Sequence, residues 1–158
     1  MRKGTLAVGL TGGIGSGKSE ALRAFRRLGA RTLCLDEAAH RVLARGGPAY
    51  GPVRRAFPGA VDVRGEIDRR ALGRAVFADL RLRRRLERLT HPAILREMRR
   101  FLRGGRGVLV VDVPLLFEAG LQKEFDLTAV VTAGRARRLA RLRRRDGLPV
   151  SESRRRMA

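Results

Sequence analysis

The chain has 158 residues, with 36 lysines and arginines against 15 acidic residues, and a formal net charge of +21. Hydrophobic residues make up 44% of it, which excludes a disordered basic tail, and no apolar run approaches the roughly 20 residues that span a membrane. The single cysteine, Cys34, cannot form an internal disulfide, which suits the reducing cytoplasm. The length suits one domain. The positive charge favours anionic partners but does not identify them.

The first part of the chain alternates strands and helices. Residues 5–10 form a short apolar run that predicts a buried strand, and residues 18–28 repeat apolar side chains at helical spacing. A second strand is expected over 31–35, where Asp36 ends the strand and could cap a helix over 37–44. This order is typical of an α/β fold, in which helices cover a parallel sheet.

The middle of the chain, residues 37–103, is predicted to be a helical insertion between the second and third strands. Asp68 is the expected N-cap of a helix over 69–78. The next helix is expected to break at His91 and Pro92, because proline at this point can open a new helix.

The last part returns to strands. Residues 108–113 are a continuous β-branched and apolar run that predicts a strand buried on both faces. A fourth strand is expected over 127–132, then an arginine-rich helix over about 135–145 and a last helix after Pro149.

Residues 12–19, GGIGSGKS, match the phosphate-binding pattern G-x-x-x-x-G-K-[ST] in full, between a predicted strand and a predicted helix. Glycines let successive N–H groups cradle phosphate oxygens, the Lys18 ammonium would bridge the β- and γ-phosphates, and the Ser19 hydroxyl would ligate Mg²⁺. A chance match has odds of only about 0.003 over the whole length. The predicted nucleotide-binding residues are Gly12, Gly13, Ile14, Gly15, Ser16, Gly17, Lys18, Ser19 and Glu20.

Two carboxylates end predicted strands. Asp112 follows a buried apolar run and is either a second group associated with Mg²⁺ or a cap of the next turn. Asp36 is either the base that takes the acceptor's proton or an N-cap. The chain lacks the N-K-x-D motif of GTP-binding proteins and is short for a motor ATPase, which favours a small-molecule kinase using ATP and Mg²⁺.

The sequence resembles the dephospho-CoA kinase family, in which T-G-G-I-G-S-G-K-S is the typical loop. Three further stretches agree with the family's motifs in order and spacing: LDEAAHRV at 35–42, the segment 67–94 and VDVPLLFE at 111–118. Together with the loop, the resemblance covers about residues 6–158. It implies a P-loop NTPase three-layer sandwich with a helical insertion and a lid helix. It also implies ATP-dependent phosphorylation of the ribose 3′-hydroxyl of dephospho-CoA, the last step of coenzyme A synthesis.

The resemblance also implies roles for single residues. Asp36 matches the second Asp of the family's D-A-D segment, which favours its role as general base, and Arg141 and Arg145 match arginines of the lid that close over the phosphates. His91 and Arg69 would contact the substrate, although a helix junction and a solvated helix face are the alternatives.

Two residues depart from the family pattern. Cys34 stands where a first Asp is usual, and Glu20 stands where Thr commonly follows the loop's serine. The extra negative charge of Glu20 could weaken ATP binding modestly.

The resemblance predicts three parts: a nucleotide-binding core of residues 1–36 and 104–134, a dephospho-CoA-binding insertion of residues 37–103, and a lid of residues 135–158. Relatives in this family continue with a last strand and a terminal helix. We therefore expect this chain to be truncated at its C-terminus, with those two elements absent.

Three alternatives remain at this stage: another P-loop metabolite kinase, a nucleic-acid-binding ATPase suggested by the +21 charge, and an inactive relative that binds CoA. One tyrosine, no tryptophan and no recognisable nucleic-acid module argue against the second. We expect a monomer with a small-molecule substrate and neither nucleic acid nor a membrane as partner.

Overall fold

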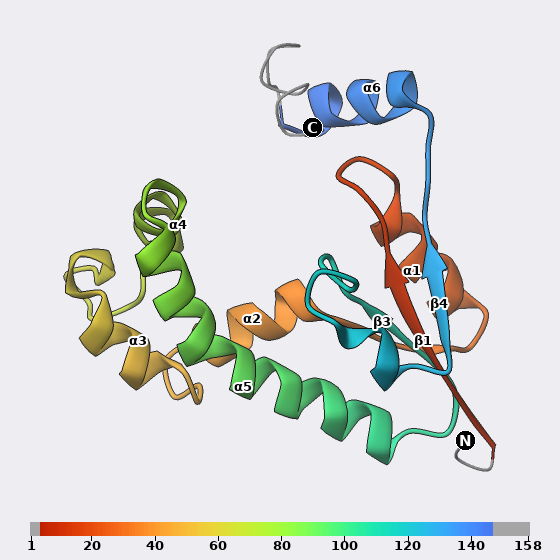
Figure 1. Cartoon of the computed structure of the whole chain (residues 1–158), viewed down its shortest axis with the longest axis horizontal. Coiled ribbons are helices and arrows are strands. Elements are labelled where there is room, and N and C mark those ends of the chain that lie inside the picture. Colours follow the sequence, from red (N-terminus) through yellow and green to blue (C-terminus); the bar gives the residue numbers. More distant parts are fainter. Residues whose placement is uncertain (1–3, 147–158) are drawn as a thin grey trace. The chain divides into compact units, whose positions relative to one another are not determined.

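The computed structural model describes residues 4–146 (Figure 1). In chain order its elements are β1 (Thr5–Thr11), α1 (Lys18–Arg27), β2 (Arg31–Cys34), α2 (Leu35–Leu43), α3 (Tyr50–Ala56), the 3₁₀ helix η1 (Pro58–Ala60), α4 (Arg69–Ala78), α5 (Leu80–Gly104), β3 (Gly107–Asp112), the 3₁₀ helix η2 (Leu121–Glu124), β4 (Leu127–Val130) and α6 (Arg135–Asp146). The helix expected after Pro149 lies outside the described residues. No helix in residues 4–146 has an apolar stretch long enough to cross a membrane.

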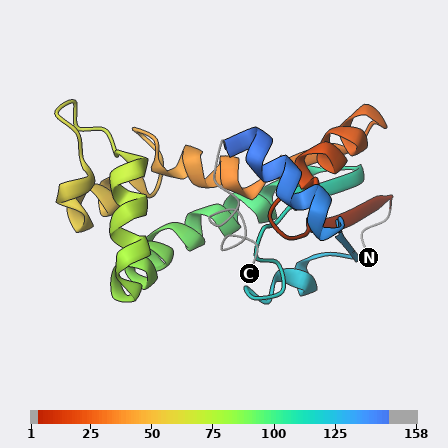
Figure 2. The same cartoon turned by 90° about the horizontal axis from the view of Figure 1, so that it is seen from above.

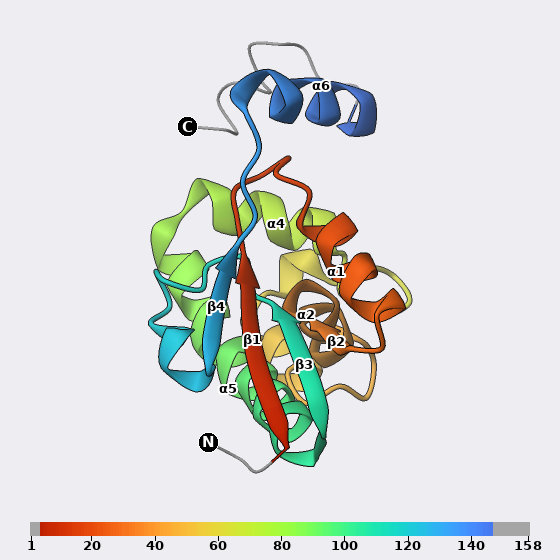
Figure 3. The same cartoon turned by 90° about the vertical axis from the view of Figure 1, so that its right-hand side faces the viewer.

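The strands of the described residues form one parallel sheet in the order β2-β3-β1-β4. Figure 3 shows β1 between β3 and β4. The predicted strands are confirmed to within two residues, and so is the α/β fold class. Because all strands run the same way, their carboxyl ends lie at one edge of the sheet, where ligands bind in open α/β folds.

Successive side chains of β1 point to opposite faces of the sheet, and each face packs against a different segment. Val8 and Leu10 belong to one buried cluster with Leu22 of α1. A Cβ atom at Gly9, on the opposite face, would lie 2.6 Å from Leu116 and 2.7 Å from Phe125. The segment after β3 therefore covers the face that α1 does not, and glycine at position 9 permits this close approach.

The chain divides into two compact units: Leu35–Arg103 forms one, and the residues up to Cys34 together with those from Gly104 onward form the other. We call these the helical unit and the sheet unit. The helical unit has its own core, because α2, α3 and α4 contribute buried side chains such as Val42, Val53 and Leu72.

Helix α3 was not predicted. Gly51 and Pro52 disfavour a helix, but Pro52 lies in the first turn, where no backbone N–H is needed. The helix forms because it buries Val53 completely and leads directly to the buried Phe57.

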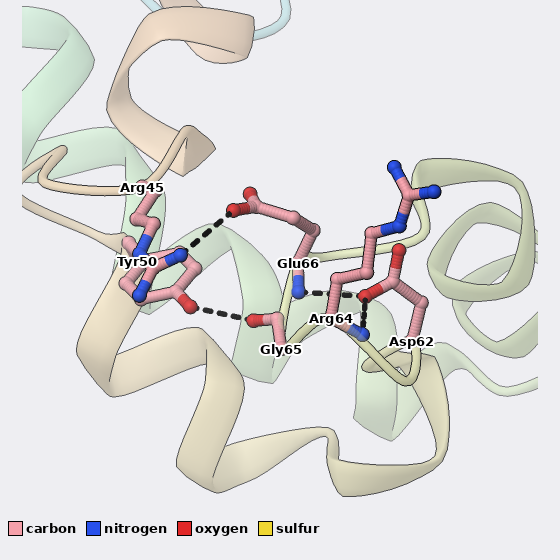
Figure 4. Close-up of polar contacts among 6 residues, drawn as sticks. All are labelled: Arg45, Tyr50, Asp62, Arg64, Gly65 and Glu66. Carbon is pink, nitrogen blue, oxygen red and sulfur yellow. Dashed lines mark hydrogen bonds and ion pairs between the residues drawn. The ribbon is translucent and has the colours of Figure 1, made fainter.

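A turn after α3 is held by side-chain hydrogen bonds to the backbone (Figure 4). The Asp62 carboxylate accepts from the N–H groups of Arg64 and Glu66 at 2.9 and 2.8 Å, and the Tyr50 hydroxyl donates to the carbonyl of Gly65. These bonds add to the backbone hydrogen bonds of the same turn, in which the Asp62 N–H donates to the Glu66 carbonyl and the Gly65 N–H to the Asp62 carbonyl, both at 2.9 Å.

Helix α5 corrects the prediction that the chain breaks at His91 and Pro92. It runs unbroken for 25 residues from Leu80 to Gly104, with Pro92 inside it. Proline inside a helix costs about 3 kcal/mol through its lost hydrogen bond and steric clash. However, the apolar residues packed on the helical unit's core stay in phase through the proline, at positions 82, 86, 89 and 93. We call these residues the α5 stripe, and a break at Pro92 would remove part of it from the core. Because the helix is unbroken, His91 does not cap a junction between two helices.

The N-cap of α4 is confirmed at Asp68. Its carboxylate accepts from the N–H groups of Arg70 and Ala71, at 2.8 and 3.1 Å. The hydrogen bonds from Ala71 and Arg70 favour the ionised form and hold the pKa of Asp68 below its ordinary value of 3.8.

We expect Asp68→Ala to lower the urea midpoint of unfolding, and Asp68→Asn to retain most of it, because asparagine also caps helices. Because folding lowers the pKa of this carboxylate, its charge stabilises the fold fully above pH 3.8 and does so less as the pH falls further. Circular dichroism at pH 7 and pH 3 tests this. The difference between wild type and Asp68→Ala should shrink at pH 3, and an equal difference at both values contradicts the account.

Candidate functional site

The predicted phosphate loop leaves the sheet at the end of β1, one of its two inner strands. In β1, Leu10 is paired with Asp112 of β3, and Thr11 with Val130 of β4. The carboxyl ends of three adjacent strands therefore surround the start of the loop. Residues 12–17 then turn away from the sheet and enter α1 at Lys18.

The loop needs glycine for its backbone path. Gly17, at the N-cap of α1, has a φ of +106°, in a region that other residues rarely adopt. Gly12 has a φ of +152°, and a Cβ atom there would overlap the backbone oxygen of Val131. The Ser16 N–H donates to the carbonyl of Gly13 at 3.1 Å, which closes the turn.

The beginning of α1 gives the loop its positive character. The first N–H groups of a helix have no partner within the helix and carry the positive end of its dipole, so they attract anions. The ammonium of Lys18 turns back over the loop and donates to the carbonyl of Gly12 at 2.6 Å. Ser19 follows in the same turn, with its side chain exposed. This arrangement suits a polyphosphate.

Glu20 lies beside this anion-binding turn but is not an isolated negative charge. Its carboxylate pairs with Arg23 at 2.7 Å and lies 3.9 Å from Arg27, and all three side chains are exposed. Exposed ion pairs contribute little stability, but these two arginines offset the charge that Glu20 places near the loop.

Asp112 ends β3 and is only 5% exposed. It pairs in register with Leu10 on one side and with Cys34 of β2 on the other. A buried carboxylate at this edge and the Ser19 hydroxyl are both hard oxygen donors, as Mg²⁺ prefers. Mg²⁺ in nucleotide sites takes one or two such protein ligands and completes its shell with phosphate oxygens and water. Within residues 4–146 no cluster of three or more acidic, histidine or cysteine side chains forms a metal cage. The residues therefore fit a Mg²⁺ ion that is shared with a nucleotide.

Asp36 is not the N-cap that the sequence suggested. Helix α2 begins at Leu35, directly after β2, so Asp36 lies inside its first turn. The helix starts this early because Leu35, Ala38 and Val42 form one buried stripe, which requires Leu35 to be helical. Asp36 lies off this stripe with its side chain exposed.

Helix α6 lies next to the loop (Figures 1 and 2), and two of its arginines donate to the loop's carbonyls. Arg138 donates through Nε to the carbonyl of Ile14 at 2.9 Å. Arg141 donates through one Nη to the carbonyls of Ser16 and Gly15, at 2.6 and 3.2 Å. The family resemblance predicts Arg141 at this site but not Arg138, although their three-residue spacing on a predicted helix places them on one face.

The remaining predicted residues are spread over the two units. Arg145 lies in α6, four residues after Arg141. Arg69 is the first residue of α4 and His91 lies inside α5, both exposed and both in the helical unit with Asp36. The structure thus brings the loop, Asp112 and α6 together in the sheet unit.

Comparisons with known proteins agree on one family. A family model described as dephospho-CoA kinase matches residues 6–158. A dephospho-CoA kinase of Methylococcus capsulatus is 43% identical over 155 residues, which cover 97% of this chain and 78% of that protein. One from Geobacillus kaustophilus is 41% identical over 158 residues, covering 97% and 79%.

Solved structures share the fold. A Thermus thermophilus protein superposes with a TM-score of 0.85 at 35% identity, covering 96% of this chain and 78% of its own. The dephospho-CoA kinase of Campylobacter jejuni has a TM-score of 0.67 at 26% identity, covering 97% and 79%.

The close approach at Gly12 predicts that Gly12→Ala weakens ATP binding by about tenfold or more, because the new methyl group must displace the backbone that follows β4. That backbone is itself fixed, since the N–H of Val131 donates to the carbonyl of Thr11 at 2.8 Å.

Isothermal titration of ATP into both proteins measures the effect. Gly73→Ala is the matched control, because Gly73 lies in α4 with open space around it. Equal ATP affinity of Gly12→Ala and wild type would show that the loop tolerates this side chain.

Proposed function

The chain belongs to the dephospho-CoA kinase family, and from this membership we propose how its own residues carry out the reaction. The reaction is the ATP-dependent phosphorylation of dephospho-CoA, the last step of coenzyme A biosynthesis. The observation that carries the proposal is the loop of residues 12–19, which leaves β1 and enters a helix with two arginines of α6 on its carbonyls.

We assign the phosphates of ATP to this loop. Its N–H groups and the first turn of α1 offer hydrogen bonds and positive potential to the β- and γ-phosphates. The ammonium of Lys18 donates to the Gly12 carbonyl at 2.6 Å in this structure and would exchange that oxygen for the phosphates. Arg141, which donates to the carbonyls of Gly15 and Ser16 in this structure, would leave them to neutralise charge on the transferred group, and Arg145 would follow it from the next turn of α6.

Ser19 and Asp112 would hold Mg²⁺ against the phosphates, the first through its hydroxyl and the second through its carboxylate. When bound, the ion would offset the negative charge that builds up on the phosphate oxygens. Ser19 is exposed in the first turn of α1, and Asp112 is fixed by strand pairing on both sides.

Asp36 would act as the general base that removes the proton from the ribose 3′-hydroxyl. Its carboxylate is exposed and is not engaged in capping α2, so both oxygens are available to an acceptor. It follows the end of β2 by two residues, at the carboxyl edge where α/β folds bind ligands.

The acceptor would bind to the helical insertion, residues 37–103, while residues 1–36 and 104–134 would bind the nucleotide and residues 135–158 would form the lid. Arg69 and His91 are exposed on α4 and α5, where they can meet the phosphates of dephospho-CoA. We further propose a monomeric cytoplasmic enzyme that requires no nucleic acid. A small-molecule acceptor needs no second chain, and the lone Cys34 suits a reducing compartment.

If Asp36 is the base, Asp36→Asn should lower kcat by about 10²–10⁴-fold, because the amide cannot accept the proton. The KM for ATP should change little, since Asp36 is not assigned to the nucleotide. Initial rates of ADP formation with saturating dephospho-CoA measure both constants.

Glu37→Gln is the matched control, because Glu37 is the next residue in the same turn and is also exposed. It should keep the wild-type rate. A wild-type rate in Asp36→Asn would remove Asp36 from the mechanism, and an equal loss in both variants would point to the charge of the turn instead.

A further inference from the structure

Arg138 makes a contact with the phosphate loop to which the proposed mechanism gives no task. Its side chain is half-buried, and its Nε donates to the carbonyl of Ile14 at 2.9 Å across 124 residues of sequence. A Cβ atom at Gly13 would lie 2.9 Å from one terminal nitrogen of Arg138 and 3.3 Å from its central carbon. The guanidinium group therefore lies directly against the loop backbone, at a position where only glycine leaves room for it.

The bonded carbonyl fixes the direction of an N–H group. Within a planar trans peptide, the C=O of one residue and the N–H of the next point in opposite directions. Every described peptide bond here is trans. A carbonyl of Ile14 that is held towards α6 therefore turns the N–H of Gly15 to the other side of the loop, away from α6.

Arg141 acts on the next two peptides in the same way. It holds the carbonyls of Gly15 and Ser16, which turns the N–H groups of Ser16 and Gly17 away from α6. The backbone of α6 also approaches closely, because a Cβ atom at Gly15 would lie 2.9 Å from the carbonyl oxygen of Arg138. Three consecutive peptides are thus held by their carbonyls. Of their N–H groups, that of Ser16 closes the turn on the Gly13 carbonyl, whereas that of Gly15 belongs to the peptide held by Arg138.

We propose that Arg138 is a positioning residue that orients the Ile14–Gly15 peptide so that the Gly15 N–H meets a phosphate of ATP. This inference rests on the proposed binding of ATP to the loop. The hydrogen bond from Nε, rather than the positive charge, orients the peptide, because the guanidinium lies on the carbonyl side of that peptide. An unrestrained peptide can rotate its N–H away, so losing this bond lowers affinity for the nucleotide.

Substitutions at position 138 separate the hydrogen bond from the charge. Glutamine places its Nε2 donor the same number of bonds from the backbone as Arg Nε and carries no charge. Methionine has a similar length and no donor, and lysine keeps the charge but has a methylene group at the position of Nε. Arg137→Met is the control on the same helix, because Arg137 is exposed.

We expect Arg138→Met to weaken ATP binding by about tenfold, within the range for a lost hydrogen bond to a charged group. Arg138→Gln should stay within about threefold of wild type, Arg138→Lys should resemble Arg138→Met, and Arg137→Met should have no effect. In steady state, KM for ATP should rise in Arg138→Met while kcat changes by less than about twofold, because the loop binds substrate and transition state alike.

Titration of ATP and of ADP into each folded variant, without dephospho-CoA, measures these affinities. The proposal is overturned if Arg138→Met binds as wild type does, or if Arg138→Gln is as weak as Arg138→Met while Arg138→Lys is normal, which would indicate a charge effect. A wild-type chain that binds no ATP would overturn the proposed function as well. One that binds ATP but does not phosphorylate dephospho-CoA would contradict only the proposed function.

Discussion

The site depends on the inner position of β1 in the parallel sheet. Hydrogen bonding to β3 on one side and β4 on the other fixes both the direction and the depth at which the chain leaves the sheet at Thr11. The phosphate loop begins at this point, and the pairing of Leu10 with Asp112 places the buried carboxylate beside it. A strand at the edge of the sheet would be held on one side only, and the loop that follows it would be less precisely placed.

The loop itself uses both sides of its peptide planes. Lys18, Arg138 and Arg141 donate hydrogen bonds to its carbonyls, and the N–H of Gly15, on the other side of the peptide that Arg138 holds, is suited to a phosphate. This accounts for a few of the arginines behind the net charge of +21, and most of the others lie exposed on helices. The charge that first suggested nucleic acid is thus partly explained by the needs of one short loop.

Local signals predicted much of this structure. The position of the loop between a strand and a helix, and the Asp68 cap, depend on neighbours within a few residues, and the structure confirms both predictions. Pro92 was misread because the local rule for proline is outweighed by packing of the α5 stripe on the helical unit's core. The N-cap interpretation of Asp36 is wrong because burial of Leu35 starts α2 two residues early. Arg138 could not be found locally, since its partner Ile14 is 124 residues away.

The most direct test of the account is the position of the phosphate in the product. The chain is incubated with MgATP and dephospho-CoA, and the product is examined by ³¹P NMR and mass spectrometry. The account predicts one new phosphomonoester on the ribose 3′-oxygen for each ADP formed. Release of inorganic phosphate with no phosphorylated acceptor, or a phosphate at another position, would contradict it.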